Sequence, residues 1–147
     1  MATEIRTEIR IKATPEKVWK LFIDYKNYPK WNPFIKSVEG NVAVGNKIVA
    51  RIQAPDSKEM VFKPIVLTYS ANKELRWLGH LLFPGLFDGE HRFQLIDNLD
   101  GTTTFIQSEK FTGILVPLFK KMLDNNTRRG FILMNEKLKA LSEANNL

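Results

Sequence analysis

The chain has 147 residues, of which 44% are hydrophobic and 26% are charged, an ordinary size and composition for one globular domain. No apolar run approaches the roughly 18 residues of a membrane span, and the N-terminus lacks the apolar stretch of a signal peptide. The sequence has no cysteine, which excludes disulfides, thiolate nucleophiles and cysteine-based metal sites. We therefore expect a single domain over residues 1–147, located in the cytoplasm.

The net charge of +6 raises the question of a polyanionic partner. Clustered Lys and Arg side chains would release counterions from phosphates, but the cations of this chain are scattered. The adjacent pairs Lys120-Lys121 and Arg128-Arg129 have no aromatic-rich basic motif around them. We expect no nucleic-acid partner and interpret the positive charge as a solvated surface.

Alternating apolar and charged residues predict a first strand over residues 3–13. Thr14-Pro15 then supplies an N-cap and a proline at the first helical position, which predicts a helix to about Asp24. The proline-interrupted segment 25–33 has room for one more helical turn. Six further strands are expected near 34–40, 47–54, 60–70, 74–82, 87–97 and 102–111, and one long helix from about Pro117 to Ala144.

The segment Asn98-Leu99-Asp100-Gly101 predicts a tight hairpin between the last two strands. Asp-Gly suits a type I turn followed by a glycine in the left-handed conformation, and a three-residue loop then pairs Asn98 with Thr102. In this register one face of the hairpin is mainly apolar, with His91 opposite Glu109, and the other face is mainly polar.

The sheet-facing stripe of the predicted long helix is small and polar in its middle. A glycine inside a helix costs about 1 kcal/mol relative to alanine, and Asn126 would be an expensive neighbour for a solid apolar core. A hollow between helix and sheet would explain Asn126 and Gly130, and Gly130→Leu would then reduce ligand capacity more than stability. Alternatively, Asn126 reaches solvent and Gly130 admits a bulky side chain such as Trp77. The whole stripe comprises Phe119, Met122, Leu123, Asn126, Gly130, Leu133, Met134 and Leu141.

The order of elements and three segments resemble the START-like (SRPBCC) superfamily, which includes polyketide cyclase/dehydrase-like and lipid-transport proteins. The segments are PEKVWKLFIDYKNYPKWNPFIKSVEG, the hairpin GEHRF…TTTFIQSEKFTG and the ending NEKLKAL, and the last two look like those of small bacterial members. The resemblance implies an α+β helix-grip fold, in which a seven-stranded curved antiparallel sheet surrounds the long C-terminal helix. It also implies a cavity for a lipid, isoprenoid, quinone or polyketide-like molecule.

His91 and Glu109 are the one inward-facing titratable pair that the sequence predicts. A carboxylate that orients an imidazole is a common arrangement for general acid–base catalysis, but the sequence favours a structural pair that satisfies two polar groups inside the sheet. If they touch, Glu109→Gln should lower the pKa of His91, because an opposite charge is removed. No phosphate-binding glycine motif, nucleophile elbow or metal-ligand spacing is present, so we expect no cofactor and no metal.

The remaining candidate residues would line or gate the cavity. The wall is expected to draw on Tyr69, Trp77, Phe93, Leu95, Phe105, Gln107, Phe111, Met122, Asn126 and Gly130. In the helix-grip fold that the resemblance implies, two apolar loops lie at one end of the cavity, and they provide Leu82, Phe83, Leu86 and Leu115 as gate residues. These loops could meet a ligand, a membrane or a partner, or pack on each other as a closed lid.

Three functions remain open at this point. The first is a non-catalytic binder or carrier of a small apolar molecule, which the polar gap in the helix stripe and the apolar loops favour. The second is a cyclase, dehydratase or isomerase in which His91 and Glu109 move protons on an aromatic or polyketide substrate. The third is an interaction module like the co-chaperone branch of the superfamily. The oligomeric state does not follow from the sequence.

Overall fold

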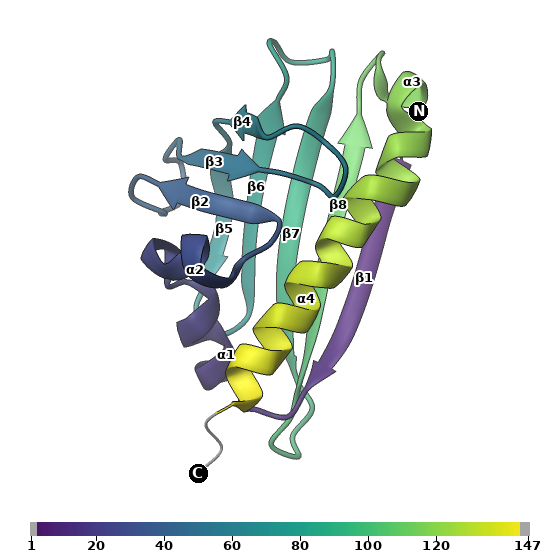
Figure 1. Cartoon of the computed structure of the whole chain (residues 1–147). Helices are drawn as coiled ribbons and strands as arrows, with labels where there is room; N and C mark the ends of the chain where they lie inside the picture. Colours follow the sequence, from purple (N-terminus) through teal and green to yellow (C-terminus); the bar gives the residue numbers. More distant parts are fainter. Residues whose placement is uncertain (1–2, 145–147) are drawn as a thin grey trace.

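The computed structural model describes residues 3–144 and has an α+β architecture, with a long C-terminal helix lying across one face of an antiparallel sheet (Figure 1). The helical elements are α1 (Pro15–Phe22), the 3-10 turn η1 (Tyr25–Asn27), α2 (Tyr28–Trp31), α3 (Val116–Met122), the π-helical segment η2 (Leu123–Thr127) and α4 (Arg128–Glu143). The strands are β1 (Thr3–Ile11), β2 (Ile35–Glu39), β3 (Val49–Ile52), β4 (Met60–Phe62), β5 (Ile65–Ser70), β6 (Glu74–His80), β7 (Asp88–Asp97) and β8 (Thr103–Thr112). No helix among the described residues is long and apolar enough to cross a membrane, and location in the cytoplasm stays a prediction.

The strands form two sheets and not the single seven-stranded sheet that the sequence predicts. Five strands are ordered β1-β8-β7-β6-β5, and three short strands are ordered β2-β3-β4. The difference arises because the run 60–70 divides into β4 and β5 around Lys63-Pro64. Proline has no N–H to donate to a sheet ladder. The Pro64 carbonyl instead accepts a hydrogen bond from the Ile48 N–H at 2.9 Å, in the segment that leads into β3.

The predicted register of the β7–β8 hairpin is confirmed. The Asn98 N–H donates to the Thr102 carbonyl at 3.1 Å, and His91 is paired with Glu109 across the two strands. The turn type differs from the predicted type I turn, because Leu99 has a left-handed φ of 63°. The register is nevertheless as predicted, because it depends on the length of the loop, and the loop has the three residues that the sequence predicts.

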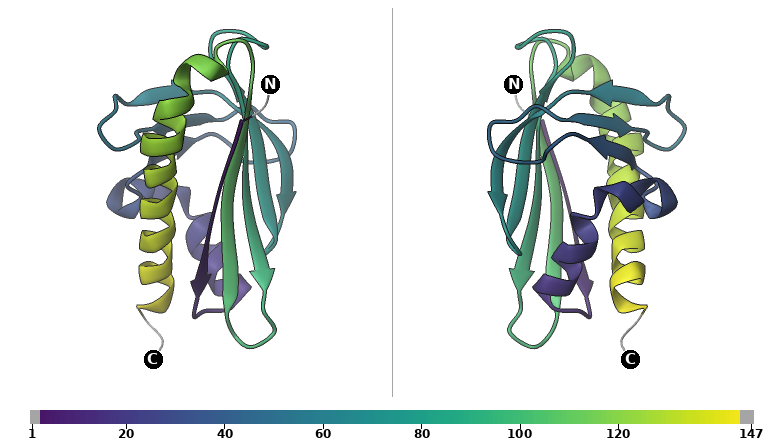
Figure 2. Two further views of the ribbon diagram at one scale, coloured as in Figure 1. Left: turned by 90° about the vertical axis from the view of Figure 1, so that its right-hand side faces the viewer. Right: turned by 90° about the vertical axis from the view of Figure 1, so that its left-hand side faces the viewer.

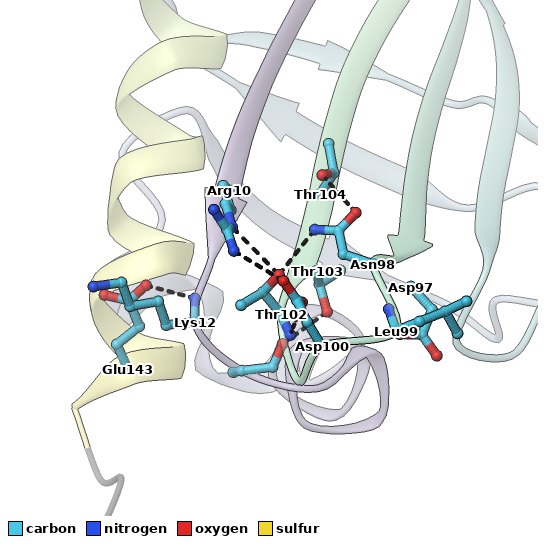
Figure 3. Close-up of polar contacts among 11 residues, drawn as sticks. Arg10, Lys12, Asp97, Asn98, Leu99, Asp100, Thr102, Thr103, Thr104 and Glu143 are labelled. Atoms are coloured by element: carbon cyan, nitrogen blue, oxygen red, sulfur yellow. Dashed lines mark hydrogen bonds and ion pairs between the residues drawn. The ribbon is translucent and has the colours of Figure 1, made fainter.

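Polar contacts fix this hairpin loop to the neighbouring strand (Figure 3). The Arg10 guanidinium of β1 lies 3.0 Å from the Asp100 carboxylate, and the Asn98 side-chain amide donates to the Thr102 hydroxyl at 3.0 Å. Nearby, the backbone N–H of Lys12 donates to the Glu143 carboxylate at 2.7 Å. The end of β1 is therefore tied both to the hairpin and to the last turn of α4.

Aromatic residues of α1 fill one half of the space between the C-terminal helix and the sheet. Pro15 occupies the first helical position after the Thr14 cap, as predicted. The ring of Trp19 packs edge-on against Tyr69 at 5.5 Å between centroids, and the ring of Phe22 lies 4.9 Å from that of Phe93. This half of the interior is therefore solid core.

The C-terminal helix carries a π-helical segment, Leu123–Thr127, which shifts its buried face. A π turn inserts one extra residue into an α-helix, so the sheet-facing positions after it no longer follow regular helical spacing. The prediction of Leu133 on this face is wrong, because its side chain is 42% exposed. The buried residues after the π turn are Gly130, Phe131, Met134, Asn135, Leu138 and Ser142. Figure 2 shows the helix standing away from the large sheet, with α1 and the small sheet on the same side.

Candidate functional site

A cavity of about 180 Å³ lies between the start of the C-terminal helix, the upper ends of β6, β7 and β8 in Figure 1, and the small sheet. An apolar cavity of roughly 150 Å³ holds a benzene ring, so this one has room for a small aromatic or branched aliphatic group. Its wall consists of Phe34, Ile52, Ala54, Ser57, Lys58, Met60, Phe62, Pro64, Trp77, Gly79, Leu81, Phe87, Gly89, Glu109, Phe111, Phe119, Met122, Leu123 and Thr127.

Two glycines of the large sheet line the cavity, and one of them leaves room for the Glu109 carboxyl group. Gly79 of β6 is paired directly with Gly89 of β7, and both line the hollow. A Cβ atom built on Gly89 would overlap with Oε2 of Glu109, so the Glu109 carboxyl group lies over this glycine. Glycine inside a strand often marks the close approach of another group. The two strand glycines are therefore a sequence signal that indicates where the hollow lies.

Of the predicted wall residues, the structure brings Trp77, Phe111 and Met122 to the cavity. The others lie elsewhere in the fold. Tyr69, Phe93, Leu95 and Phe105 belong to the core or pack against it in the half of the interior that α1 fills, Gln107 is buried in a polar cluster, and Asn126 donates to the Ser57 hydroxyl at 3.2 Å.

The hollow does not lie at Gly130, contrary to the sequence-based expectation. A Cβ atom on this glycine would overlap with the Phe34 ring and would lie 2.8 Å from its Cε1 atom. Gly130 thus admits a bulky aromatic side chain, as the alternative interpretation held, but the side chain is Phe34 and not Trp77. The ring packs edge-on against Phe131 at 5.3 Å between centroids.

Glu109 reaches the cavity, whereas His91 lies behind it. Oε1 of Glu109 is 3.3 Å from Nδ1 of His91, and the His91 side chain is only 1% exposed. The two atoms are close but are not aligned as a hydrogen bond, so Nδ1 has no hydrogen-bond partner among residues 3–144. The imidazole is stacked between Phe93 at 4.3 Å and Phe131 at 5.0 Å.

A buried chain of hydrogen bonds fixes which nitrogen of His91 carries the proton. The Thr7 hydroxyl donates to the Gln107 carbonyl at 3.0 Å, so it accepts from the Asn135 amide at 2.8 Å. The Asn135 carbonyl oxygen then accepts from the Gln107 amide at 2.8 Å. Oε1 of Gln107, 2.9 Å from Nε2 of His91, is left as an acceptor. Nε2 therefore carries the proton, and Nδ1 presents a lone pair toward Glu109.

Burial holds both groups uncharged near neutral pH. Desolvation lowers the pKa of His91 to about 3, against a smaller raising effect of its hydrogen bond with Gln107. Desolvation also raises the pKa of Glu109 to about 8. Glu109 is therefore a neutral carboxylic acid at the cavity wall and not the carboxylate that orients an imidazole. Within the described part of the chain no cluster of three or more His, Asp or Glu side chains is placed to hold a metal ion.

The four predicted gate residues lie next to the cavity but do not line it. Leu82 and Phe83 are 86% and 57% exposed, while Leu86 and Leu115 are partly buried. The two loops do pack on each other, because the Leu115 N–H donates to the Leu86 carbonyl at 3.0 Å. The cavity wall draws instead on their neighbours Leu81, Phe87 and Phe119.

Sequence reasoning missed the contribution of the small sheet and the loop between its last two strands. Ile52, Ala54, Ser57, Lys58, Met60 and Phe62 all reach the cavity. The strands β3 and β4 are short, with four and three residues, and their side chains do not alternate clearly between apolar and polar. No residue pattern indicated that this hairpin covers the cavity.

The fold and the cavity define a helix-grip protein with an internal site for an apolar group. The model of the family described as polyketide cyclase / dehydrase and lipid transport matches residues 2–143. The chain belongs to this family, which confirms the START-like resemblance. A search of curated protein sequences gave no match.

Solved structures with the same fold include enzymes of distant sequence. Zhui aromatase/cyclase from Streptomyces sp. R1128 is 11% identical with a TM-score of 0.78, over 97% of this chain and 94% of that one. A norcoclaurine synthase point mutant from Thalictrum flavum is 13% identical with a TM-score of 0.75, over 100% and 98%. A structural-genomics protein from Mesorhizobium loti is 22% identical with a TM-score of 0.72, over 99% and 100%. At these identities the likeness shows the fold alone.

Proposed function

We propose that this protein binds or carries a small hydrophobic molecule, such as a lipid, isoprenoid, quinone or polyketide-like compound, between the C-terminal helix and the two sheets. The observation that carries the proposal is the cavity of about 180 Å³, whose wall is mainly aliphatic and aromatic. Apolar hollows of this size are uncommon in well-packed proteins, because each loses dispersion contacts. Family membership supports the same function.

Filling the cavity should weaken the binding of a small apolar ligand. Ala54 lines the hollow, so Ala54→Phe should weaken the binding of toluene by at least about tenfold, or ~1.4 kcal/mol. An NMR titration that follows the Trp77 indole N–H reports on the cavity directly, because the ring forms part of its wall. Ala140→Phe, at an exposed position of α4, is the matched control and should bind like the wild type. No toluene-dependent shift at Trp77 in the wild type would defeat the proposal.

A second candidate function is proton transfer on a bound aromatic or polyketide substrate. It is favoured by one observation, that the cavity wall contains a carboxylic acid whose pKa burial raises to about 8. A pKa near the working pH suits a general acid or base. Turnover of an aromatic polyketide that disappears in Glu109→Gln would support this function, and turnover that survives this substitution would rule it out.

A further inference from the structure

Glu109 is the one acidic side chain on a mainly apolar cavity wall, which also includes Ser57, Lys58 and Thr127. The titratable side chains that line the cavity are Glu109 and Lys58, and Lys58 is exposed on the loop between β3 and β4. The facing helical segment contributes Phe119, Met122, Leu123 and Thr127, none of which carries a charge. From the neighbouring strand β7, His91 is the group that faces Glu109. Among residues 3–144, the exposed Lys58 is therefore the one cationic side chain at the cavity wall, and burial outweighs any effect of it on the pKa of Glu109.

The hydroxyl of a protonated Glu109 has no well-aligned acceptor among residues 3–144. Nδ1 of His91 presents a lone pair, but it lies 3.3 Å away and outside hydrogen-bond geometry. The hydrogen bond from Nε2 to Gln107 holds the imidazole of His91 in place. The rings of Phe93 and Phe131 also stack on the imidazole. His91 is thus prevented from turning to meet the acid, and the donor of Glu109 remains available to a group inside the cavity.

We propose that the cavity selects a mostly apolar molecule with one uncharged hydrogen-bond acceptor, such as a ketone carbonyl, and that Glu109 donates the hydrogen bond that positions it. This inference rests on the proposed function, because it concerns the same cavity. An ammonium group would require Glu109 to ionise in an apolar site, and a carboxylate would bring an uncompensated charge into it. A neutral acceptor requires neither.

Three ligands of nearly equal shape test this selectivity: acetophenone, α-methylstyrene, in which a methylene group replaces the carbonyl oxygen, and 1-phenylethylamine. By calorimetric titration at a pH of about 6.5, the wild type should bind acetophenone about five- to tenfold more tightly than α-methylstyrene, the effect of one net hydrogen bond. The ammonium form of 1-phenylethylamine should bind more weakly than acetophenone. Glu109→Met should remove the preference for the ketone, and Glu109→Gln, which keeps an uncharged donor, should retain it.

The pH dependence of ligand binding distinguishes the wild type, which has an ionisable Glu109, from Glu109→Gln, which does not. Between a pH of about 6.5 and one of about 9.5, the wild type should lose its preference for acetophenone as Glu109 ionises, whereas Glu109→Gln should keep it. Glu90→Gln is the matched control, because Glu90 lies on the outer face of the same hairpin and pairs with Lys110. It should behave as the wild type does.

The outcomes distinguish this inference from the function on which it rests. If the wild type binds acetophenone and α-methylstyrene equally well, or binds the ammonium ion best, the selectivity is wrong and the apolar cavity function stands. A ketone preference that survives Glu109→Met assigns the donor to another residue and overturns the role of Glu109. If none of the three ligands binds, the proposed function fails and the inference fails with it.

Discussion

His91 and Glu109 influence the stability of the protein in opposite directions along the pH scale. The pKa of His91 is about 3 in the folded protein against an ordinary 6.5, so the unfolded chain binds the extra proton between these values. Stability due to His91 is therefore lost as the pH falls through this range. The pKa of Glu109 is raised from 4.5 to about 8, so here the folded protein binds the extra proton, and stability is lost as the pH rises.

The variant Glu109→Gln should remove the loss of stability at alkaline pH. In urea titrations, the free energy of unfolding of the wild type should fall by on the order of a few kcal/mol between a pH of about 5 and one of about 9, and that of the variant should change much less. Glu90→Gln, at the outer face, serves as control. Parallel curves for the wild type and Glu109→Gln would show that Glu109 ionises normally in the fold.

The structure also changes the expectation for the His91 titration. From the sequence, Glu109→Gln should lower the pKa of His91 by removing an opposite charge. With Glu109 uncharged throughout the range in which His91 titrates, there is no such charge to remove. The pairing of the two residues could be predicted from the hairpin register. Their charge states could not, because they depend on burial by distant segments, such as the Phe131 ring of α4 that stacks on His91.

At the scale of elements, the long helix is held by a contact between a glycine and an aromatic ring. Gly130→Ala should gain about 1 kcal/mol of helix propensity but lose more, because the new methyl group overlaps with Phe34 and overpacking costs about 1–3 kcal/mol. Thermal and urea unfolding should show net destabilisation. The loss should be smaller in a Phe34→Leu background, and Glu136→Ala on the exposed face is the control for helix propensity. A stabilised Gly130→Ala would show that the ring moves aside freely.

The π-helical segment explains why the helix stripe was only partly predicted. Regular helical spacing correctly places Leu123, Gly130 and Met134 on the buried face, but it does not predict Phe131, Asn135 and Leu138, which are buried after the inserted residue. A π turn has no sequence signature comparable to a proline or a capping box. The strand break at Pro64 was also missed, but the sequence carries a signal for it, because proline removes a donor from the sheet ladder.

At the scale of the whole molecule, exposed apolar side chains gather at the end where the cavity lies, and we propose that this end makes transient contact with membranes. Ile114 and Leu118 are 78% and 75% exposed and adjoin the loop of Leu82 and Phe83. The basic pair Lys120-Lys121 follows in the same helix, so anionic lipids would be attracted to this end.

The double variant Phe83→Ser/Ile114→Ser should bind vesicles of phosphatidylcholine and phosphatidylserine at least about a hundredfold more weakly than the wild type, because each exposed apolar side chain contributes roughly 1.5–3 kcal/mol when fully buried. Co-sedimentation measures the effect. Leu99→Ser is the control, because Leu99 is 89% exposed in the hairpin loop at the opposite end (Figure 1). Equal binding by the wild type and the double variant would exclude these loops as the contact.

The overall order of elements was predictable because it depends on local signals: period-2 alternation, the Thr14-Pro15 cap and the turn before Thr102. The place of the cavity was not, because it depends on how distant segments share one interior. The rings of Trp19 and Phe22 fill one half, while Gly79 and Gly89 line the hollow in the other half. Only the fold shows which aromatic residues are core and which face the hollow.

The strand that begins the chain completes its pairing only with residues made much later. The Thr7 hydroxyl donates to the Gln107 carbonyl, 100 positions along the chain, and β1 pairs with no strand other than β8 among the described residues. At roughly 5–20 residues per second of translation, β1 waits on the order of 5–20 s for its neighbour, and longer for α4 to cover it. During synthesis the nascent chain therefore presents a strand of unpaired backbone groups, which is the state that chaperones protect from association with other chains.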